Sequence, residues 1–251
     1  MKVNKLILEI ADKKGFEIKR SLGGMLNENY MIYFNNQNYV FRIPIKNLRH
    51  KKSIEREYKG IGYYVNGNEY NYRSIEEQVI FSNLCSQKGI SVARIIDYSR
   101  DYMITEFLEG IEIPDLLKSE KNVLEIINKY LFSLILAHNK NIVFGDRWGY
   151  NTIINKEGNI INFDFDIKLN TEDSKEFEIS QAVYYSLFFS KENKSVLGYL
   201  QEFLKREDLN YIYDKNMITK YLEGHSQYFK GTIYGGIERE ICKLTSIEKN
   251  E

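Results

Sequence analysis

The hydrophobic pattern of this chain changes once, close to Gly110, and that change limits the folds open to it. In the first part, apolar and polar residues alternate over short segments, which is typical of strands with one buried face. These segments are residues 17–20, 30–34, 38–43, 94–98 and 102–107. In the second part, apolar residues recur every three or four positions, as in helices with one buried face. We therefore predict an α+β fold in which a strand-rich first lobe (1–109) and a helix-rich second lobe (110–251) border a cleft.

Helices are also expected inside the first lobe. Residues 3–14 indicate a short helix, and residues 74–87 indicate a longer one. Ser74 is followed three positions later by Glu77, a capping-box pattern that satisfies the free N–H groups at a helix start. Residues 45–73 carry charges, glycines and tyrosines without a clear period. We expect a loop or a short helix there, as an insertion.

The composition excludes several classes of protein. Hydrophobic residues make up 43% of the 251 residues, which indicates a sizeable core and no wholesale disorder. The 35 Lys and Arg residues balance the 35 Asp and Glu residues, so the formal net charge is zero. Nucleic-acid-binding proteins are usually basic along one face, so we expect no nucleic-acid partner. The one short basic run, residues 49–52, is interpreted as a solvated loop.

The cysteines and the N-terminal segment indicate a cytoplasmic protein. Cys85 and Cys242 lie far apart and show no metal-binding spacing, and Cys85 falls in an apolar helical pattern that predicts a core position. Residues 1–9 are too short and too charged for a signal peptide. No run of 18 apolar residues occurs, so no membrane span is expected.

Asp146, Asn151 and Asp164 have the spacing with the clearest chemical meaning. Asp146 and Asn151 are five positions apart on a loop after a long helical pattern, residues 123–139. Asn151 and Asp164 are thirteen positions apart, and the two short strands between them form a hairpin that brings its ends together. Two oxygen donors at that point suit Mg²⁺, and the carboxylate of Asp146 can face a substrate hydroxyl. This arrangement favours phosphoryl transfer, which needs positioning and charge neutralisation.

Four further motifs precede this set along the chain. A glycine turn lies in residues 23–30, and a strand with a single cation, Arg42, covers residues 39–44. Glu77 lies on the helix that follows, and residues 104–110 (Ile-Thr-Glu-Phe-Leu-Glu-Gly) end the strand-rich part. In this order the motifs resemble the kinase-like phosphotransferases that include choline kinases and aminoglycoside phosphotransferases. The resemblance runs from about residue 15 to residue 189, with a gap at 45–73.

The resemblance implies a two-lobed protein-kinase-like fold, with a small antiparallel sheet in the N-lobe and a larger helical C-lobe. It implies ATP or GTP and Mg²⁺ as cofactors and a small molecule as phosphoryl acceptor. Arg42, paired with Glu77, would steady the α- and β-phosphates, and the backbone of the glycine turn would cover them. The implied roles are Asp146 as catalytic base, Asn151 and Asp164 as metal ligands, and Gly23, Gly24, Asn27, Arg42, Glu77, Glu106 and Leu108 as nucleotide contacts.

Several positions depart from the family pattern or leave two interpretations open. Phe144 stands where the family usually has a histidine that braces the catalytic loop, and we expect its ring to pack instead. Arg147 and Trp148 are unusual directly after the catalytic aspartate, and Trp148 either stacks on a substrate or packs the loop. Asp166 lies close to Asp164, so either carboxylate could hold the metal. We prefer Asp164, because its distance from Asn151 and the preceding apolar strand fit the pattern better.

The acceptor site is less evident in the sequence. His138 lies on the apolar face of its helix, which favours a core position over catalysis. Glu176, Glu178 and Glu223, on the C-terminal helices, could meet a cationic acceptor, but solvated helix faces are the preferred interpretation. Glu77 is open between capping its helix and pairing with Arg42.

Three functions compete. The first is a small-molecule kinase acting on the hydroxyl of an amino alcohol, a sugar or an antibiotic. The second is a protein kinase, including a toxin-like one, although no Ala-Pro-Glu-like end of an activation segment follows Asp164. The third is a pseudokinase that binds nucleotide or only a partner. The presence of Asp146, Asn151 and Asp164 together argues against the third, because a binding module has no need of all three.

Overall fold

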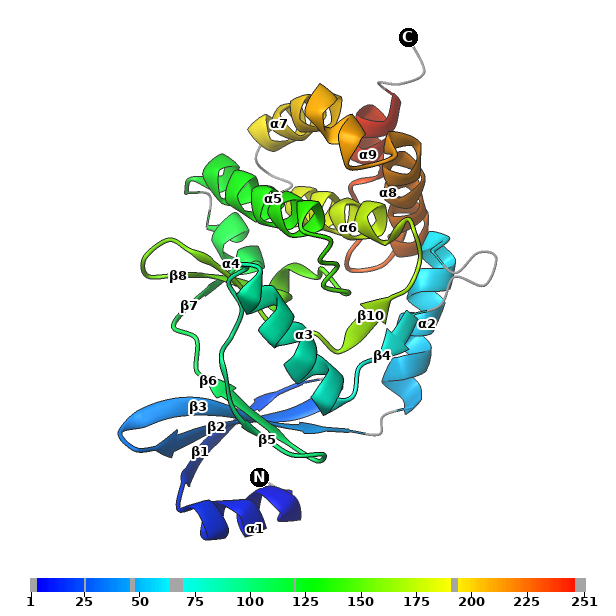
Figure 1. The fold of residues 1–251 in the computed structure, drawn as a ribbon. Coiled ribbons are helices and arrows are strands. Elements are labelled where there is room, and N and C mark those ends of the chain that lie inside the picture. Colours follow the sequence, from blue (N-terminus) through cyan, green and yellow to red (C-terminus); the bar gives the residue numbers. More distant parts are fainter. Residues whose placement is uncertain are drawn as a thin grey trace.

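The computed structural model describes residues 4–24, 26–45, 48–63, 70–119, 121–190 and 194–246. A sheet-containing lobe and a larger helical lobe lie one above the other in Figure 1. No helix in these ranges is both long and apolar enough to cross a membrane.

The N-lobe is built on a five-stranded antiparallel sheet, in which the strand order is β1-β2-β3-β6-β5. Its apolar and polar residues alternate as predicted, so that one face buries Phe41 against α1 and the other packs Met103 against α3. The elements are α1 (Lys5–Lys14), β1 (Glu17–Gly23), β2 (Asn27–Phe34), β3 (Gln37–Pro44), α3 (Ile75–Gln87), β5 (Ile95–Tyr98) and β6 (Met103–Glu106). The predicted capping box of α3 is present, with Ser74 and Glu77 bonded to each other's backbone N–H groups.

The C-lobe surrounds α5, whose residues Val123–Asn139 match the predicted helix. The predicted catalytic loop follows α5, and a small sheet of order β7-β8-β9 contains the predicted hairpin. The remaining elements are α4 (Ile113–Lys118), β7 (Gly110–Glu112), η1 (Gly149–Asn151), β8 (Thr152–Asn155), β9 (Ile160–Asn162), α6 (Ser174–Phe189), α7 (Lys194–Lys205), η2 (Glu207–Tyr211), α8 (Lys215–Phe229) and α9 (Glu238–Thr245). Cys85 is fully buried in the large core that α5, α6 and α8 share, as predicted.

The segment 45–73, whose sequence has no clear period, contains a helix of fourteen residues, α2 (Leu48–Ile61), and a short strand, β4 (Tyr70–Tyr72). The basic run at 49–52 is therefore helical, and the expectation of a loop there is wrong. Strand β4 pairs with β10 (Ile167–Leu169), which follows the predicted metal-binding segment. Figure 1 shows α2 beside α8, away from the five-stranded sheet. The predicted division at residue 109 stays a prediction, but a segment before it packs against the C-terminal helices.

His225 on α8 is buried between aromatic rings. Its Nδ1 lies 2.6 Å from the backbone oxygen of Tyr221, and its ring stacks on Tyr184 with centroids 5.3 Å apart. Burial lowers the pKa of His225 from 6.5 to about 4, because the charged imidazolium is poorly solvated there.

This histidine predicts a pH dependence of stability. A group whose pKa is lower in the folded state contributes stability above its unfolded value and loses it as the pH falls through the folded value. Between pH 6.5 and 4, the wild type should lose about 3 kcal/mol of unfolding free energy more than His225→Phe, which has no such group to titrate. Urea denaturation of both proteins at pH 7 and pH 4 measures this difference. An equal loss in both would contradict the assignment.

Candidate active site

Asp146 lies in the loop between α5 and η1, held by three donors. The backbone N–H of Trp148 donates to Oδ1 at 3.1 Å, and Nε2 of Gln181 donates to the same oxygen at 3.4 Å. Asn151 donates from Nδ2 to the backbone oxygen of Asp146 at 3.1 Å. Burial raises the pKa of the Asp146 carboxyl, although Arg147 and the two donors to Oδ1 oppose it. The side chain is thus fixed through Oδ1, and Oδ2 is the oxygen left to accept a proton.

A buried polar chain supports this loop from below. Glu178 on α6 accepts a hydrogen bond from the backbone N–H of Gly145 and lies 2.8 Å from Nε2 of His138. The other ring nitrogen of His138 lies 2.7 Å from the hydroxyl of Tyr213. Glu178 and His138 are both fully buried. The core position predicted for His138 is confirmed, and its contacts connect α5 to α6 beneath the catalytic loop.

Arg73, shortly before α3, joins the predicted catalytic loop to the predicted metal-binding segment. Its Nη1 donates to the backbone oxygens of Phe144 at 2.9 Å, Phe165 at 3.1 Å and Ile167 at 2.5 Å. Its guanidinium also lies 4.0 Å from the ring centroid of Phe81. Burial lowers the pKa of Arg73 to about 10, which still leaves it charged at neutral pH. One cation therefore fixes the spacing between the loop of Asp146 and the segment of Asp164.

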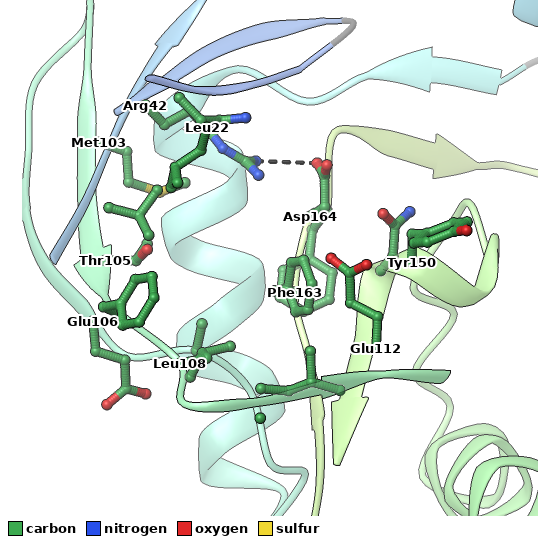
Figure 2. A pocket seen from close by; sticks show the side chains of 18 of the residues that line it. Leu22, Arg42, Met103, Thr105, Glu106, Leu108, Glu112, Tyr150, Phe163 and Asp164 are labelled. Atoms are coloured by element: carbon green, nitrogen blue, oxygen red, sulfur yellow. Dashed lines mark hydrogen bonds and ion pairs between the residues drawn. The ribbon is translucent and has the colours of Figure 1, made fainter. Parts of the chain in front are cut away.

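Arg42 on β3 reaches across the cleft to both candidate metal ligands. Its Nη1 lies 3.1 Å from Oδ1 of Asp164 and 3.5 Å from Oδ1 of Asp166, and Figure 2 shows the first of these contacts as a dashed line. Asn27 on β2 donates to the second oxygen of Asp166 at 2.5 Å. Two N-lobe side chains thus hold the acidic pair of the C-lobe.

The two carboxylates of this pair have opposite pKa shifts. Burial favours the neutral form of Asp164, but the charge of Arg42 outweighs it and the pKa lies below the ordinary value. Burial and the neighbouring charge of Asp164 raise the pKa of Asp166 to about 7. The side chain of Asp164 is also more open, 30% exposed against 12% for Asp166. Asp164 is the ionised and accessible carboxylate of the two, which supports it as the metal ligand.

Asp164 also has an unusual backbone, with φ at 61°. A non-glycine residue in this left-handed region is strained, and such strain persists where the surroundings fix it, often at functional sites. Here the surroundings include the ion pair with Arg42.

Two adjoining cavities meet at these residues. The larger one, about 520 Å³, lies between the lobes and is lined by Arg42, Glu106 and Leu108 (Figure 2). The smaller one, about 280 Å³, is lined by Asp146 and Asp166. Four residues line both cavities: Asn29, Tyr150, Asn151 and Asp164. The larger cavity has the position expected for a nucleotide base, and the smaller one is lined by Asp146, the predicted catalytic base.

The glycine turn is only partly at the site. Gly24 and Asn27 line the smaller cavity, whereas Gly23 lines neither. Gly24 has φ at 134°, and a Cβ there would overlap the backbone oxygen of Asn27 and crowd Asn29. No side chain fits at position 24, and the glycine there lets the backbone of the turn approach the smaller cavity closely.

The predicted ion pair between Arg42 and Glu77 is wrong for this structure. Glu77 is bound to Ser74, with Oε2 at 2.7 Å from the backbone nitrogen, and it lines neither cavity. The side chain next to it, Gln78, faces Arg42 instead, with Oε1 at 3.5 Å from Nη1. The physical reason is that a capping box fixes Glu77 at the start of α3, while Arg42 already has two carboxylates across the cleft.

The unusual residues around Asp146 are packed. Phe144 is fully buried and stacks on Phe165 with centroids 5.7 Å apart, as expected for an aromatic residue in place of a bracing histidine. Arg147 is fully buried above Phe144, and its Nη1 donates to Asn162 at 3.2 Å. Trp148 packs against Tyr185 and also lines the smaller cavity, so both of its interpretations stay open.

Glu176, Glu178 and Glu223 were predicted to lie on solvated helix faces, and this prediction is wrong for the first two. Glu178 is fully buried beneath the loop, and Glu176 is 7% exposed and accepts from the backbone N–H of Asp214 at 2.9 Å. Sequence reasoning also missed Arg73 and Gln181. Glu178 and Gln181 had a signal, because they are polar residues in the strongly apolar helical pattern of α6; Arg73 had none.

The residues present fit a magnesium ion. Asn151 and Asp164 both border the two cavities, and the amide oxygen of Asn151 is not used in its bond to Asp146. No group of three or more His, Cys, Asp or Glu side chains in the described ranges is arranged to hold a metal by itself. Such a two-residue oxygen site suits Mg²⁺, which keeps few protein ligands and completes its shell with phosphate and water.

This chain is similar to a kinase domain of known structure and to one family of protein domains. A search of curated proteins found no matching sequence. The crystal structure of a double mutant of the Mycobacterium tuberculosis PknI kinase domain superposes with a TM-score of 0.47 and 11% identity, over 92% of this chain and 95% of that one.

The sequence also matches the RIO domain family over residues 39–197, a range that includes Arg42, Asp146, Asn151 and Asp164. This family is kinase-like, so the predicted two-lobed kinase-like fold is confirmed. The finer resemblance to choline kinases and aminoglycoside phosphotransferases is not supported by the match. Because the match covers more than half of the sequence, the chain belongs to the RIO domain family.

Proposed function

We propose that this protein transfers the γ-phosphoryl group of ATP or GTP to a hydroxyl group of a small molecule. The observation that carries the proposal is the convergence of Arg42, Asp146, Asn151 and Asp164 around two adjoining cavities. Phosphoryl transfer needs little covalent chemistry from a protein, and it relies on positioning and on neutralising phosphate charge. These four side chains offer a base, a cation and two metal-binding oxygens at one place.

The residues act as follows in the proposed reaction. The base of the nucleotide enters the larger cavity beside Glu106 and Leu108, and Arg42 faces its phosphates. Asn151 and Asp164 hold Mg²⁺, which neutralises phosphate charge when bound. As the oxygen of the acceptor hydroxyl bonds to the γ-phosphorus, Oδ2 of Asp146 accepts the proton of that hydroxyl. The bond from the γ-phosphorus to the bridging oxygen breaks, and a nucleoside diphosphate leaves.

A small acceptor is favoured by what surrounds Asp146. Helix α6 begins at Ser174, ten positions after Asp164, so little chain is left for a platform that binds an extended peptide. Ile54 of α2 and Trp148 line the smaller cavity beside Asp146. A protein acceptor is the second candidate, because the RIO domain family is protein-kinase-like.

The test is transfer of labelled phosphate from ATP and from GTP to a panel of amino alcohols, sugars, aminoglycosides, nucleosides and proteins. Transfer to a small molecule supports the proposal. Transfer to proteins alone favours the second candidate. Nucleotide binding without transfer to any acceptor would favour a pseudokinase.

The metal site is tested by separate replacement of the two aspartates. Asp164→Asn should weaken magnesium-dependent nucleotide binding by at least about tenfold, because it removes the ionised ligand. Asp166→Asn should weaken it less than about threefold, because its raised pKa and its greater burial make Asp166 the less ionised and less accessible carboxylate of the two. Titration with a fluorescent ATP analogue, with and without Mg²⁺, measures both. A larger effect at Asp166 would reverse the assignment.

A further inference from the structure

Two segments of the candidate active site lie side by side without a backbone hydrogen bond between them. They are residues 143–146, which end at the proposed base, and residues 164–167, which begin at the proposed metal ligand. A Cβ at Gly145 would overlap the backbone oxygen of Ile167, so the two backbones pass close to each other. In the described ranges, no backbone N–H of either segment donates to the other. Their relative position therefore depends on side chains.

Backbone oxygens of both segments converge on one guanidinium group. Buried carbonyl groups need donors, and partially negative oxygens that face one another repel. A charged donor between them offsets both effects, because it attracts the oxygens of the two segments at the same time. Nη1 of Arg73 lies 2.9 Å from the oxygen of Phe144, 3.1 Å from that of Phe165 and 2.5 Å from that of Ile167, and Nη2 lies 3.5 Å from that of Val143.

Arg73 is itself held in place on three sides. Strand β4 ends directly before it and pairs with β10, as Figure 1 shows. Its backbone N–H donates to the oxygen of Asp166 at 2.7 Å, and its guanidinium lies 4.0 Å from the ring centroid of Phe81. The guanidinium thus has little freedom to follow either segment if that segment moves.

Arg73 is also connected to Arg42 through Gln78, which is 4% exposed. Nε2 of Gln78 donates to the backbone oxygen of Arg73 at 3.3 Å, and its Oε1 lies 3.5 Å from Nη1 of Arg42. The same Nη1 lies 3.1 Å from Oδ1 of Asp164. Asp164 is therefore held through its backbone by Arg73 and through its side chain by Arg42, and the two arginines are linked.

The two proposed metal ligands have a separate connection that does not involve Arg73. The backbone N–H of Phe163, next to Asp164, donates to the backbone oxygen of Asn151 at 3.1 Å. The hairpin of β8 and β9 lies between Asn151 and Asp164 and also sets their spacing. Loss of Arg73 would consequently shift the base relative to the metal ligands, rather than separate the metal ligands from each other.

We propose that Arg73 is a positioning residue for phosphoryl transfer, which holds the loop of Asp146 and the segment of Asp164 at the separation that the reaction needs. This inference rests on the proposed function and adds to it a residue that lines neither cavity. Arg73 acts through the backbone of the two segments. The effect can be large, because a misplacement of about 1 Å can lower a rate about 10²-fold.

Steady-state kinetics test the proposal first. Arg73→Met has a similar length but no donor, and it should lower kcat at least about tenfold, with KM for ATP within about threefold. Arg73→Lys should recover most of the rate, because one nitrogen of Arg73 makes three of the four contacts and lysine keeps one charged nitrogen. Arg100→Met, at an exposed turn, is the matched control.

Rates are expressed per nucleotide-binding site, counted by isothermal titration, so that unfolded protein does not lower kcat. Arg73→Gln, which is shorter and neutral, is the second variant, and it should change kcat in the same direction if Arg73→Met does not fold. A kcat within about twofold of the wild type in the folded variant would overturn the proposal.

A double-mutant cycle with Asp146→Asn separates positioning from general support of the fold. If Arg73 acts by placing the base, its replacement should lower the rate less than about threefold where the base is already absent. An equal factor in both backgrounds would show that Arg73 only stabilises the protein, and the proposal would fail.

Hydrogen exchange, followed by mass spectrometry, tests the contact without a phosphoryl acceptor. In Arg73→Met or Arg73→Gln, peptides that cover 143–148 and 164–168 should exchange at least about tenfold faster, while α9 keeps the wild-type rate. Unchanged exchange in both segments refutes the inference, whether or not transfer is found. Faster exchange in these segments, together with a wild type that transfers phosphate to no acceptor, refutes the proposed function alone.

Discussion

The Asp146→Asn variant is expected to transfer phosphate about 10²- to 10⁴-fold more slowly than the wild type, the range that removal of a general base usually produces. Asparagine retains an oxygen that can accept from Trp148 and Gln181, so the loop should keep its shape. It cannot accept a proton at the second position, where Oδ2 of the carboxylate accepts it in the proposed reaction. The rate constant for transfer of labelled phosphate, measured at saturating ATP and acceptor, gives the effect.

Nucleotide affinity is the control for this variant. Asp146 lines the smaller cavity but not the larger one, so binding of a fluorescent ATP analogue should change by less than about threefold. Asp12→Asn, at an exposed position of α1, provides a matched replacement outside the site. If Asp146→Asn transferred phosphate at the wild-type rate, the assignment of the base would be wrong.

The second large effect is expected on stability, from Glu178→Leu. Leucine has a similar size but leaves the N–H of Gly145 and the ring nitrogen of His138 without their buried partner. Breaking one side of a buried charged network commonly costs about 3–5 kcal/mol. Because native proteins are stable by only about 5–15 kcal/mol, this loss is a large share of the total. Urea denaturation at pH 7 measures the change in unfolding free energy.

Two further variants are controls for the loss of stability in Glu178→Leu. Glu172→Leu, at an exposed position shortly before α6, should change stability by less than about 0.5 kcal/mol. Glu178→Gln keeps an oxygen for the N–H of Gly145, and so should cost less than the leucine variant. A loss below about 1 kcal/mol for Glu178→Leu would show that the buried chain does not support the catalytic loop.

Patterns within a few positions of the sequence were sufficient to predict most of the helices and strands. The strands around Arg42, the capping box at Ser74 and the helix 123–139 each follow from a period or a motif within a few positions. The convergence on Asn151 and Asp164 followed from a hairpin, which is also local. A helix in residues 45–73 was expected only as an alternative to a loop, because the residues of α2 are mostly charged or polar.

The sequence by itself determined the order of the elements and the candidate catalytic set Asp146, Asn151 and Asp164. Only the tertiary structure decided which charges meet: Arg42 contacts Asp164 and Asp166 rather than Glu77. The physical reason is that a motif fixes neighbours along the chain, whereas the partner of a buried charge is chosen by burial and distance between segments. Arg42 and Asp164 are more than a hundred positions apart, and no local pattern connects them.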